Sequence, residues 1–227
     1  MTGTSPYDDF PDLFDRFTAV WDGMSGEFSD WVSAALPGRA RAGVDLGCGA
    51  GRHSVLLAER LDRVLAVDTS ARMLEVARCT RDRPGISYRQ QGVLETAGSY
   101  DVVLSVHALH HVGPPEAVLP HVRSLVAPGG TAILADIVDP GGWPTPEFHQ
   151  NRAWDSARLV HEATGDVDAA VDVLRLLLHP RWISLARADV PLTRERFHRA
   201  YGEVFGGAVF HDGFGPLICS LVWTAPL

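Results

Sequence analysis

A glycine-rich run, Val44-Asp-Leu-Gly-Cys-Gly-Ala-Gly51, is the clearest chemical signal in the sequence. It ends a short apolar stretch and precedes a segment with helical spacing. Glycines at positions 47, 49 and 51 let a ligand approach the backbone closely, and they permit backbone angles that other residues avoid. In an open parallel sheet, ligands bind at this junction between strand and helix. Because the same glycines can serve tight packing of the strand against the helix, the turn alone leaves both interpretations open.

Asp68 stands at the end of the next apolar stretch. A carboxylate at this position can accept hydrogen bonds from both hydroxyls of a ribose, as in dinucleotide-binding enzymes. The alternative is an acid that favours the start of the following helix through the helix dipole. Ser70 is the better N-cap for that helix, and we therefore expect Asp68 to bind a nucleoside.

Apolar stretches alternate with helical patterns in the segment that must position these residues. The alternation predicts right-handed βαβ units, and hence an α/β fold whose parallel sheet carries helices on both faces. Pro128-Gly-Gly130 is expected to form a turn before the fifth strand. The expected strands are 42–47, 63–67, 86–91, 100–106 and 131–138, and the expected helices are 52–61, 71–80 and 115–126.

The remaining segments are expected to form one domain together with this sheet. Aromatic and apolar residues between 10 and 36 predict one or two helices, broken near Gly23 to Gly26. The later segments predict two helices (147–163 and 167–178), a helix over 193–205 with Thr193 as N-cap, and closing strands at 208–211 and 216–224. The expected parts are an N-terminal helical lid (1–40), a ligand-binding core (41–138), a helical cap (139–191), and a C-terminal helix with closing strands (192–227).

Four features in this order resemble the class I, Rossmann-like S-adenosylmethionine-dependent methyltransferases. They are the G-x-G-x-G spacing after Asp45, Asp68, the run Leu109-His-His-Val112, and Pro128-Gly-Gly130 before a strand. Nicotinamide-binding turns have the spacing G-x-G-x-x-G instead. The resemblance implies a seven-stranded mixed sheet of order 3-2-1-4-5-7-6 whose last strand is antiparallel. It also implies S-adenosylmethionine as the cofactor and S-adenosylhomocysteine as its product.

The resemblance further implies which residues bind the cofactor. Relatives usually carry an acid that accepts from the adenine amine where this chain has Val93. Backbone groups of Val93 and Leu94, or the side chain of Glu95, are the available substitutes. Met73 is either an adenine contact or an ordinary core residue. The implied residues are Asp45, Gly47, Cys48, Gly49, Gly51, Asp68, Thr69, Met73, Val93, Leu94, Ser105 and Val106.

Histidines after the fourth predicted strand are the candidates for proton transfer. A general base is needed only if the acceptor must lose a proton, and histidine suits this role near neutral pH. Of His107, His110 and His111, we expect His110 or His111 to be the base, the alternative being a residue that ties the loop down. Three further histidines, either acceptor contacts or solvated helix residues, lie in the predicted cap: His149, His161 and His179.

Composition limits the partners of the chain. Its 28 acidic and 20 basic side chains give a net charge of −8, without the basic stripe typical of nucleic-acid binding. Three cysteines without a C-x-x-C spacing predict neither a disulfide framework nor a zinc site. Of the six tryptophans, all but Trp223 lie outside the predicted sheet, which favours an apolar small-molecule acceptor such as a secondary metabolite. The sequence leaves a homodimer open.

No apolar run approaches the ~20 residues that a membrane helix requires. The first ten residues are acidic and lack the apolar run of a signal peptide. We therefore expect a cytoplasmic protein with no membrane partner.

Two other classes of function compete with a methyltransferase. A relative that binds the cofactor without transferring methyl, such as a cyclase or a pseudoenzyme subunit, is modestly favoured by Val93. A nicotinamide-dependent oxidoreductase is disfavoured by the glycine spacing.

Overall fold

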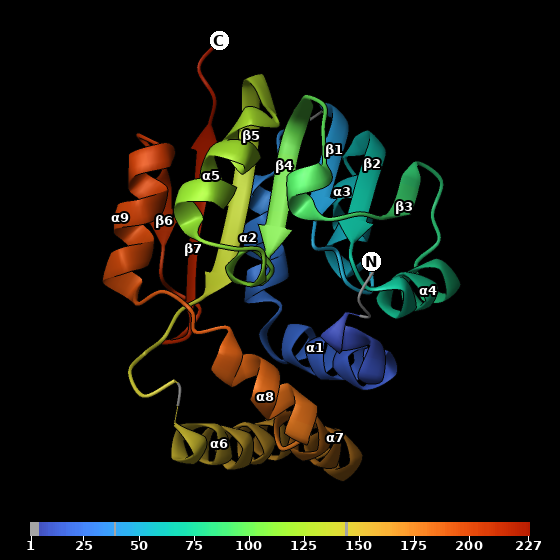
Figure 1. Cartoon of the computed structure of the whole chain (residues 1–227). Helices are drawn as coiled ribbons and strands as arrows, with labels where there is room; N and C mark the ends of the chain where they lie inside the picture. Colours follow the sequence, from blue (N-terminus) through green and yellow to red (C-terminus); the bar gives the residue numbers. More distant parts are fainter. Residues whose placement is uncertain (1–4, 39, 144) are drawn as a thin grey trace.

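The computed structural model describes residues 5–38, 40–143 and 145–227, with a seven-stranded sheet at its centre (Figure 1). The strand order is β3-β2-β1-β4-β5-β7-β6, as predicted. Strands β1 to β5 pair in parallel, whereas β7 is antiparallel to both β5 and β6. Residues 1–4 and 39 of the predicted lid and residue 144 of the predicted cap lie outside the described residues. The strands are β1 (Ala40–Leu46), β2 (Leu61–Asp68), β3 (Ile86–Gln90), β4 (Tyr100–Val106), β5 (Val126–Ile137), β6 (Val209–His211) and β7 (Ile218–Thr224).

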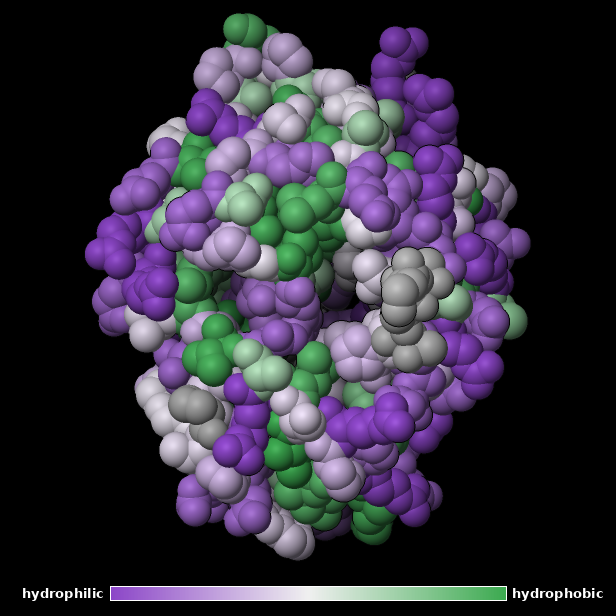
Figure 2. Space-filling view, in the orientation of Figure 1, coloured by the Kyte–Doolittle hydropathy of each residue, from purple (hydrophilic) through white to green (hydrophobic). Residues whose placement is uncertain are grey.

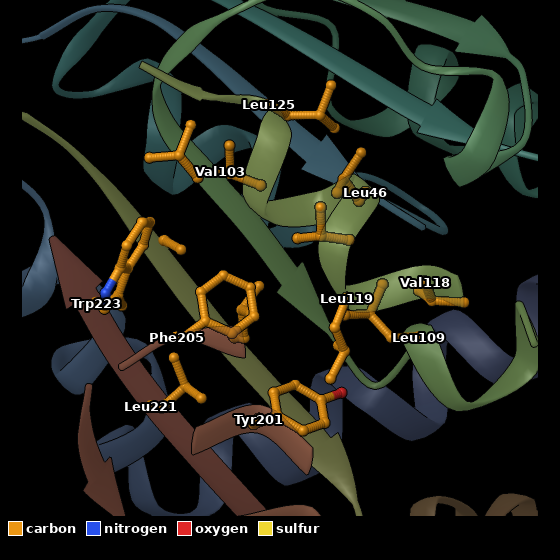
Figure 3. Close-up of a cluster of buried hydrophobic side chains, with 14 of the residues drawn as sticks. Leu46, Val103, Leu109, Val118, Leu119, Leu125, Tyr201, Phe205, Leu221 and Trp223 are labelled. Atoms are coloured by element: carbon orange, nitrogen blue, oxygen red, sulfur yellow. The ribbon is translucent and has the colours of Figure 1, made fainter. Parts of the chain in front are cut away.

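Apolar side chains cover both faces of the sheet, because successive residues of a strand point to opposite faces. In β4, Val103 belongs to one buried cluster, and Val102 and Leu104 belong to another. The first cluster packs the sheet against α5 (Pro115–Ser124) and α9 (Arg194–Val204). Figure 3 shows side chains of these helices meeting those of β4 and β7.

Three helices cover the opposite face: α2 (Glu27–Ala35), α3 (Arg52–Ala58) and α4 (Ala71–Thr80). Val32 of α2 and Leu57 of α3 are fully buried in the second cluster. Leu74 of α4 packs on Ala66 of β2 in a smaller cluster. These helices hold the ends of β1 and β2, where the candidate ligand residues lie.

The N-terminal helices change direction at Gly26. Gly26 has φ +65, a left-handed conformation that favours glycine, and it separates α1 (Pro11–Ser25) from α2. The predicted break near Gly23 to Gly26 is therefore confirmed. A short 3-10 helix, η1 (Pro6–Asp9), precedes α1.

Helices α6 (Pro146–Thr164), α7 (Val167–Leu177) and α8 (Pro180–Ala188) lie beyond the carboxyl ends of the parallel strands, next to α1 (Figure 1). Their apolar faces form a cluster with η1 and α1 that includes Phe10 and Trp182. The sequence predicted α6 and α7 but missed α8. Pro180 stands at the start of α8, where its fixed φ and missing N–H suit a helix N-terminus.

The predicted turn at Pro128-Gly-Gly130 is wrong, because strand β5 runs through it. Tyr100 of β4 pairs with Val126 of β5, and Val102 pairs with Thr131. The additional residues between Val126 and Thr131 therefore form a bulge in β5. Gly129 has φ +70 within this bulge.

Among the helices of the described residues, none is long and apolar enough to span a bilayer.

Candidate functional site

The glycine turn after β1 is held by β2. The backbone N–H groups of Gly47 and Cys48 both donate to the carbonyl of Val67, at 2.9 Å. Gly47 has φ +74, and a Cβ there would collide with that of Ala108. Gly49 has φ +51, and its added Cβ would lie 3.3 Å from Met73 Cε. A side chain at either position would therefore strain the turn.

Gly51 has a different role from the other two glycines. It is the left-handed N-cap residue of α3, with φ +81. A Cβ at Gly51 would lie 2.5 Å from the hydroxyl of Tyr88. The close packing of Tyr88 therefore explains why position 51 is a glycine.

The side chain of Asp68, at the end of β2, hydrogen-bonds to the turn. One carboxylate oxygen accepts from Gly49 N–H and the other from Ser70 N–H, each at 2.8 Å. Each carboxylate oxygen has two acceptor sites, so Asp68 retains capacity for further donors. Burial raises the pKa of Asp68. Ser70 also caps α4 by accepting from Met73 N–H at 3.0 Å, as predicted.

Asp45 is a second acid at the turn and is only 2% exposed. The Ser54 hydroxyl donates to one of its oxygens at 2.6 Å. Burial raises the pKa of Asp45 to about 7, although the Ser54 hydrogen bond works in the opposite direction. Asp45 therefore stands close to half-ionised at neutral pH.

A chamber of about 1240 Å³ opens at this turn and extends between the sheet and helices α1 and α6. Drug-sized ligands occupy ~300–1,000 Å³, so the chamber has room for more than one such molecule. The space-filling view shows apolar residues in the middle of one face, bordered by polar ones (Figure 2). The predicted cofactor residues that line the chamber are Asp45, Gly47, Cys48, Gly49, Asp68, Thr69, Met73, Val93, Leu94 and Val106.

Gly51 and Ser105 are not among the lining residues in the described part of the chain. The Ser105 hydroxyl is buried and donates to the carbonyl of Leu46 at 2.9 Å. This hydrogen bond ties β4 to the end of β1, next to the turn.

The segment after β3 borders the chamber with both Val93 and Glu95. The carbonyl of Val93 already accepts from Thr96 N–H at 3.1 Å and from His121 Nε2 at 3.0 Å. Two donors saturate a carbonyl oxygen. The Glu95 carboxylate accepts from Gly92 N–H at 3.0 Å and is otherwise exposed.

The two histidines predicted as bases occupy different environments. His110 Nδ1 pairs with the buried Asp136, and its backbone N–H donates to the same carboxylate at 2.9 Å. His110 lines a smaller cavity of about 160 Å³ and not the main chamber of the described structure. His111 lines the main chamber.

His111 joins three segments that are distant in the sequence. Its Nδ1 lies 2.9 Å from the carboxylate of Asp189, and its Nε2 lies 2.8 Å from the hydroxyl of Tyr7. Burial lowers the pKa of His111 to about 4, so the ring is neutral at pH 7. With its proton on Nδ1 facing Asp189, Nε2 accepts from Tyr7.

Two chamber histidines, His53 and His107, have buried Nε2 atoms with no hydrogen-bond partner among the described residues. Phe28 packs against both rings, at 5.7 and 5.9 Å. Burial lowers their pKa values to about 3 for His53 and about 4 for His107. His107 has φ +55, a strained backbone for a residue other than glycine. Sequence reasoning missed His53, although it lies in the first turn of the helix that follows the glycine turn.

The three cap histidines do not line the chamber in the described structure. His149 is 2% exposed and packs against Trp143 and Phe148. His161 is exposed. His179 packs against Phe10 at 5.5 Å.

Ion pairs connect α1 to the segments that flank the glycine turn. Arg52 of α3 contacts Asp15 at 3.0 Å and Asp22 at 3.1 Å. Arg81, after α4, contacts Asp15 at 2.8 Å. These side chains are only 16–25% exposed, so water screens the pairs less than it would at an open surface.

One cluster outside the chamber brings three metal-ligating side chains within 4.8 Å: His198, Asp212 and Cys219. The Arg194 guanidinium lies 2.9 Å from Asp212 and neutralises its carboxylate. Burial and the hydrogen bond to Asp212 raise the pKa of the Cys219 thiol to about 12, which opposes metal binding.

Comparison with known proteins agrees with this arrangement. The family model described as a methyltransferase domain matches residues 44–134, from β1 into β5. Residues 44–134 are thus similar to a methyltransferase domain. The cofactor of this family is S-adenosylmethionine. The glycine turn, the two acids and the apolar wall of the chamber fit such a nucleoside with an amino-acid end.

Solved structures share the fold of the whole chain. A S-adenosylmethionine-dependent methyltransferase from Thermotoga maritima superposes with a TM-score of 0.61 at 18% identity, covering 96% of this chain and 97% of that one. The N-methyltransferase NodS from Bradyrhizobium japonicum WM9, in complex with S-adenosyl-L-homocysteine, gives 0.53 at 14% identity, covering 94% and 87%.

Sequence relatives include two proteins named ubiquinone biosynthesis O-methyltransferase. The one from Xanthomonas axonopodis pv. citri (strain 306) is 36% identical over 115 residues, which is 48% of each chain. The one from Aeromonas salmonicida (strain A449) is 30% identical over 141 residues, 55% of this chain and 59% of the relative. The matches thus span about half the length of these relatives.

Proposed function

We propose that this chain transfers a methyl group from S-adenosylmethionine to a small-molecule acceptor such as a secondary metabolite. The supporting observation is the chamber itself, which joins the glycine turn, the buried Asp45 and the half-buried Asp68 to an aromatic compartment. Its volume of about 1240 Å³ allows cofactor and acceptor to lie side by side. The division into lid, core and cap belongs to the same proposal, since α1 and α6 supply the wall that faces the turn.

The residues at the turn have complementary roles toward the cofactor. Asp68 is placed to accept from the ribose hydroxyls, and Asp45 to hold the positively charged ammonium group. Met73 and Leu94 offer apolar surface to the adenine. Because the Val93 carbonyl is saturated, we assign the adenine amine to Glu95. The bound cofactor supplies a sulfonium methyl group for in-line attack by the acceptor.

Positioning is the main contribution of this chain to the reaction. Holding two reactants in a reactive geometry contributes ~7–11 kcal/mol to lowering a barrier. Helices α1 and α6 line the side of the chamber that faces the turn, and the ion pairs of Asp15 and Asp22 hold α1 in place.

Two histidines that line the chamber, His107 and His111, are candidates to remove a proton from the acceptor. His111 remains a candidate base, but both of its ring nitrogens already have partners in Tyr7 and Asp189. His107 faces the same chamber with its Nε2 unpartnered among the described residues. We therefore propose His107 as the proton acceptor and His111 as a residue that positions Tyr7.

The first test is thermal unfolding with S-adenosylmethionine, S-adenosylhomocysteine or NAD. A ligand at 100 times its dissociation constant adds about 2.7 kcal/mol to the free energy of unfolding. That corresponds to a rise of roughly 5–11 °C for a chain of this size. We expect the rise with the two sulfur ligands and not with NAD.

Asp68→Ala should diminish that rise, because it removes hydrogen bonds to a charged group that are worth about 1.5–3 kcal/mol each. Asp62→Ala, an exposed acid on the same strand, is the matched control and should retain it. If no ligand shifts the wild type, the proposal fails and only the fold remains. Formation of S-adenosylhomocysteine with any acceptor would exclude a non-methylating relative.

A further inference from the structure

The part of the chamber away from the glycine turn is strongly aromatic, and we call it the acceptor compartment. The compartment is built from α1, α2, α6 and the loop before β7. Edge-to-face and tilted ring contacts recur there, such as Phe28 with Phe214 at 5.0 Å and Phe17 with Trp21 at 6.0 Å. Its aromatic residues are Phe14, Phe17, Trp21, Phe28, Phe148 and Phe214.

Arg152 of α6 interrupts this apolar lining with a positive charge. Its guanidinium makes no ion pair and no hydrogen bond with any residue of the described ranges. The guanidinium carbon lies 5.5 Å from the centroid of the Trp143 ring. Burial lowers the pKa of Arg152 to about 10, which still leaves the group charged at neutral pH.

Among the other charged side chains around the compartment, Glu27 of α2 is exposed and has no ion-pair partner in the described ranges, whereas the following ones are paired. Arg52, the second arginine that lines the chamber, is bound by Asp15 and Asp22. Asp155, one turn from Arg152 on α6, lies 3.7 Å from Arg158. Arg152 is thus a lining cation without an anion among the described residues.

A half-buried charge without a partner is costly, and a bound anion would remove that cost. A guanidinium presents a planar fork of donors that matches a carboxylate. A ring beside that carboxylate would fill the aromatic compartment, where ring pairs favour edge-to-face contacts. The unpaired guanidinium and the aromatic lining together favour one ligand that carries an aromatic ring and an acidic group.

We propose that the acceptor is an aromatic carboxylate, whose anionic group binds Arg152 while its ring lies among the aromatic side chains. This inference rests on the proposed methyl transfer, because it assigns the second ligand of the same chamber. His53 and His107 line the same chamber, and their buried Nε2 atoms have no hydrogen-bond partner among the described residues, so a rotation of either ring would offer a hydrogen bond to a polar substituent of the ligand.

The test is calorimetric titration of the protein saturated with S-adenosylhomocysteine. The probes are 2-naphthoate and 2-naphthalenemethanol, which share a ring system and differ in charge. Wild type should bind the naphthoate roughly ten- to a hundredfold more tightly than the alcohol, as expected for hydrogen bonds to a charged group. Arg152→Gln should abolish this preference, and Arg152→Lys should restore part of it.

Arg199→Gln is the control, because Arg199 of α9 is exposed, makes no ion pair with the described residues and does not line the chamber of the described structure. It should retain the full preference. Equal affinity for the two probes in the wild type, including no measurable binding of either, would overturn the inference. So would a preference that persists in Arg152→Gln. Loss of S-adenosylhomocysteine binding in the wild type would instead refute the proposed function, so the two failures are distinguishable.

Discussion

Two carboxylates at the same turn, the buried Asp45 and the half-buried Asp68, carry different numbers of hydrogen bonds. Asp68 accepts from two backbone N–H groups, whereas Asp45 accepts from the Ser54 hydroxyl alone. Hydrogen bonds to the charged form lower the pKa of an acid, and burial raises it. Burial is the larger effect at both acids and raises both pKa values, and the pKa of about 7 at Asp45 makes the ligand-free protein sensitive to pH.

Asp45→Asn should change how stability depends on pH. The folded-state pKa of Asp45 lies above its unfolded value, so the folded state binds the proton more tightly and loses stability as pH rises through 7. Between pH 4.5 and 8, the free energy of unfolding of the wild type should fall by about 3 kcal/mol relative to Asp45→Asn. Urea unfolding at several pH values measures this difference.

The control for this series is Asp62→Asn, whose carboxylate is exposed on β2 and should follow the wild type at every pH. A difference between the wild type and Asp45→Asn that stays constant from pH 4.5 to 8 would contradict the assigned ionisation. Added S-adenosylhomocysteine should flatten the wild-type dependence, because its ammonium group favours the ionised form of Asp45.

At the scale of an element, α1 is held over the glycine turn by few charged side chains. Asp15 contacts both Arg52 and Arg81 at 2.8–3.0 Å, and Asp22 contacts Arg52. The helix also packs against α7 and α6. Because these ion pairs are few, α1 is a candidate for local opening beside the chamber.

Asp15→Asn should promote opening of α1 without unfolding the sheet. Removing one partner of a half-buried pair is expected to cost about 1–2 kcal/mol, between the values for exposed and buried pairs. Amide hydrogen exchange in residues 11–25 should therefore accelerate about 5- to 30-fold. Asp12→Asn, an exposed acid on the same helix, should leave the rates unchanged. Equal rates in both variants would show that the ion pairs do not hold the helix.

At the scale of the molecule, the chamber lies between two separately packed clusters. One cluster belongs to the sheet with α5 and α9, and the other joins α1 to α6, α7 and α8 (Figures 1 and 3). A ligand bound between them should stabilise the elements that border it more than those on the far edge of the sheet.

Saturating S-adenosylhomocysteine should therefore slow hydrogen exchange unevenly. At 100 times the dissociation constant, segments that must open to release the ligand gain up to about 2.7 kcal/mol, or roughly 100-fold slower exchange. We expect this in α1 and in residues 47–51, and little change in local exchange of β6 at the sheet edge. Uniform slowing, with β6 protected as strongly as α1, would argue against a ligand site at the turn.

The sequence by itself determined the alternation of strands and helices and the place of the turn, whereas the order of the strands followed from the resemblance to class I methyltransferases. Apolar alternation, the glycine spacing and the acid that ends β2 are local patterns, because each depends on neighbours within one strand, turn or helix. For the same reason, α4, the Thr193 cap and the break at Gly26 were predictable. Helix α8 and the bulge in β5 were missed, since they depend on packing against other parts of the chain.

Only the tertiary structure decided which side chains meet. Tyr7, His111 and Asp189 come from three distant segments, and no spacing relates them. His110 and His111 are adjacent in the sequence, yet one pairs with a core carboxylate and the other lines the chamber. The unpartnered charge of Arg152 is likewise invisible in the sequence, because a pattern of residues shows a charge but not the absence of its partner. Pairing, burial and pKa depend on distances between elements, and folding alone sets those distances.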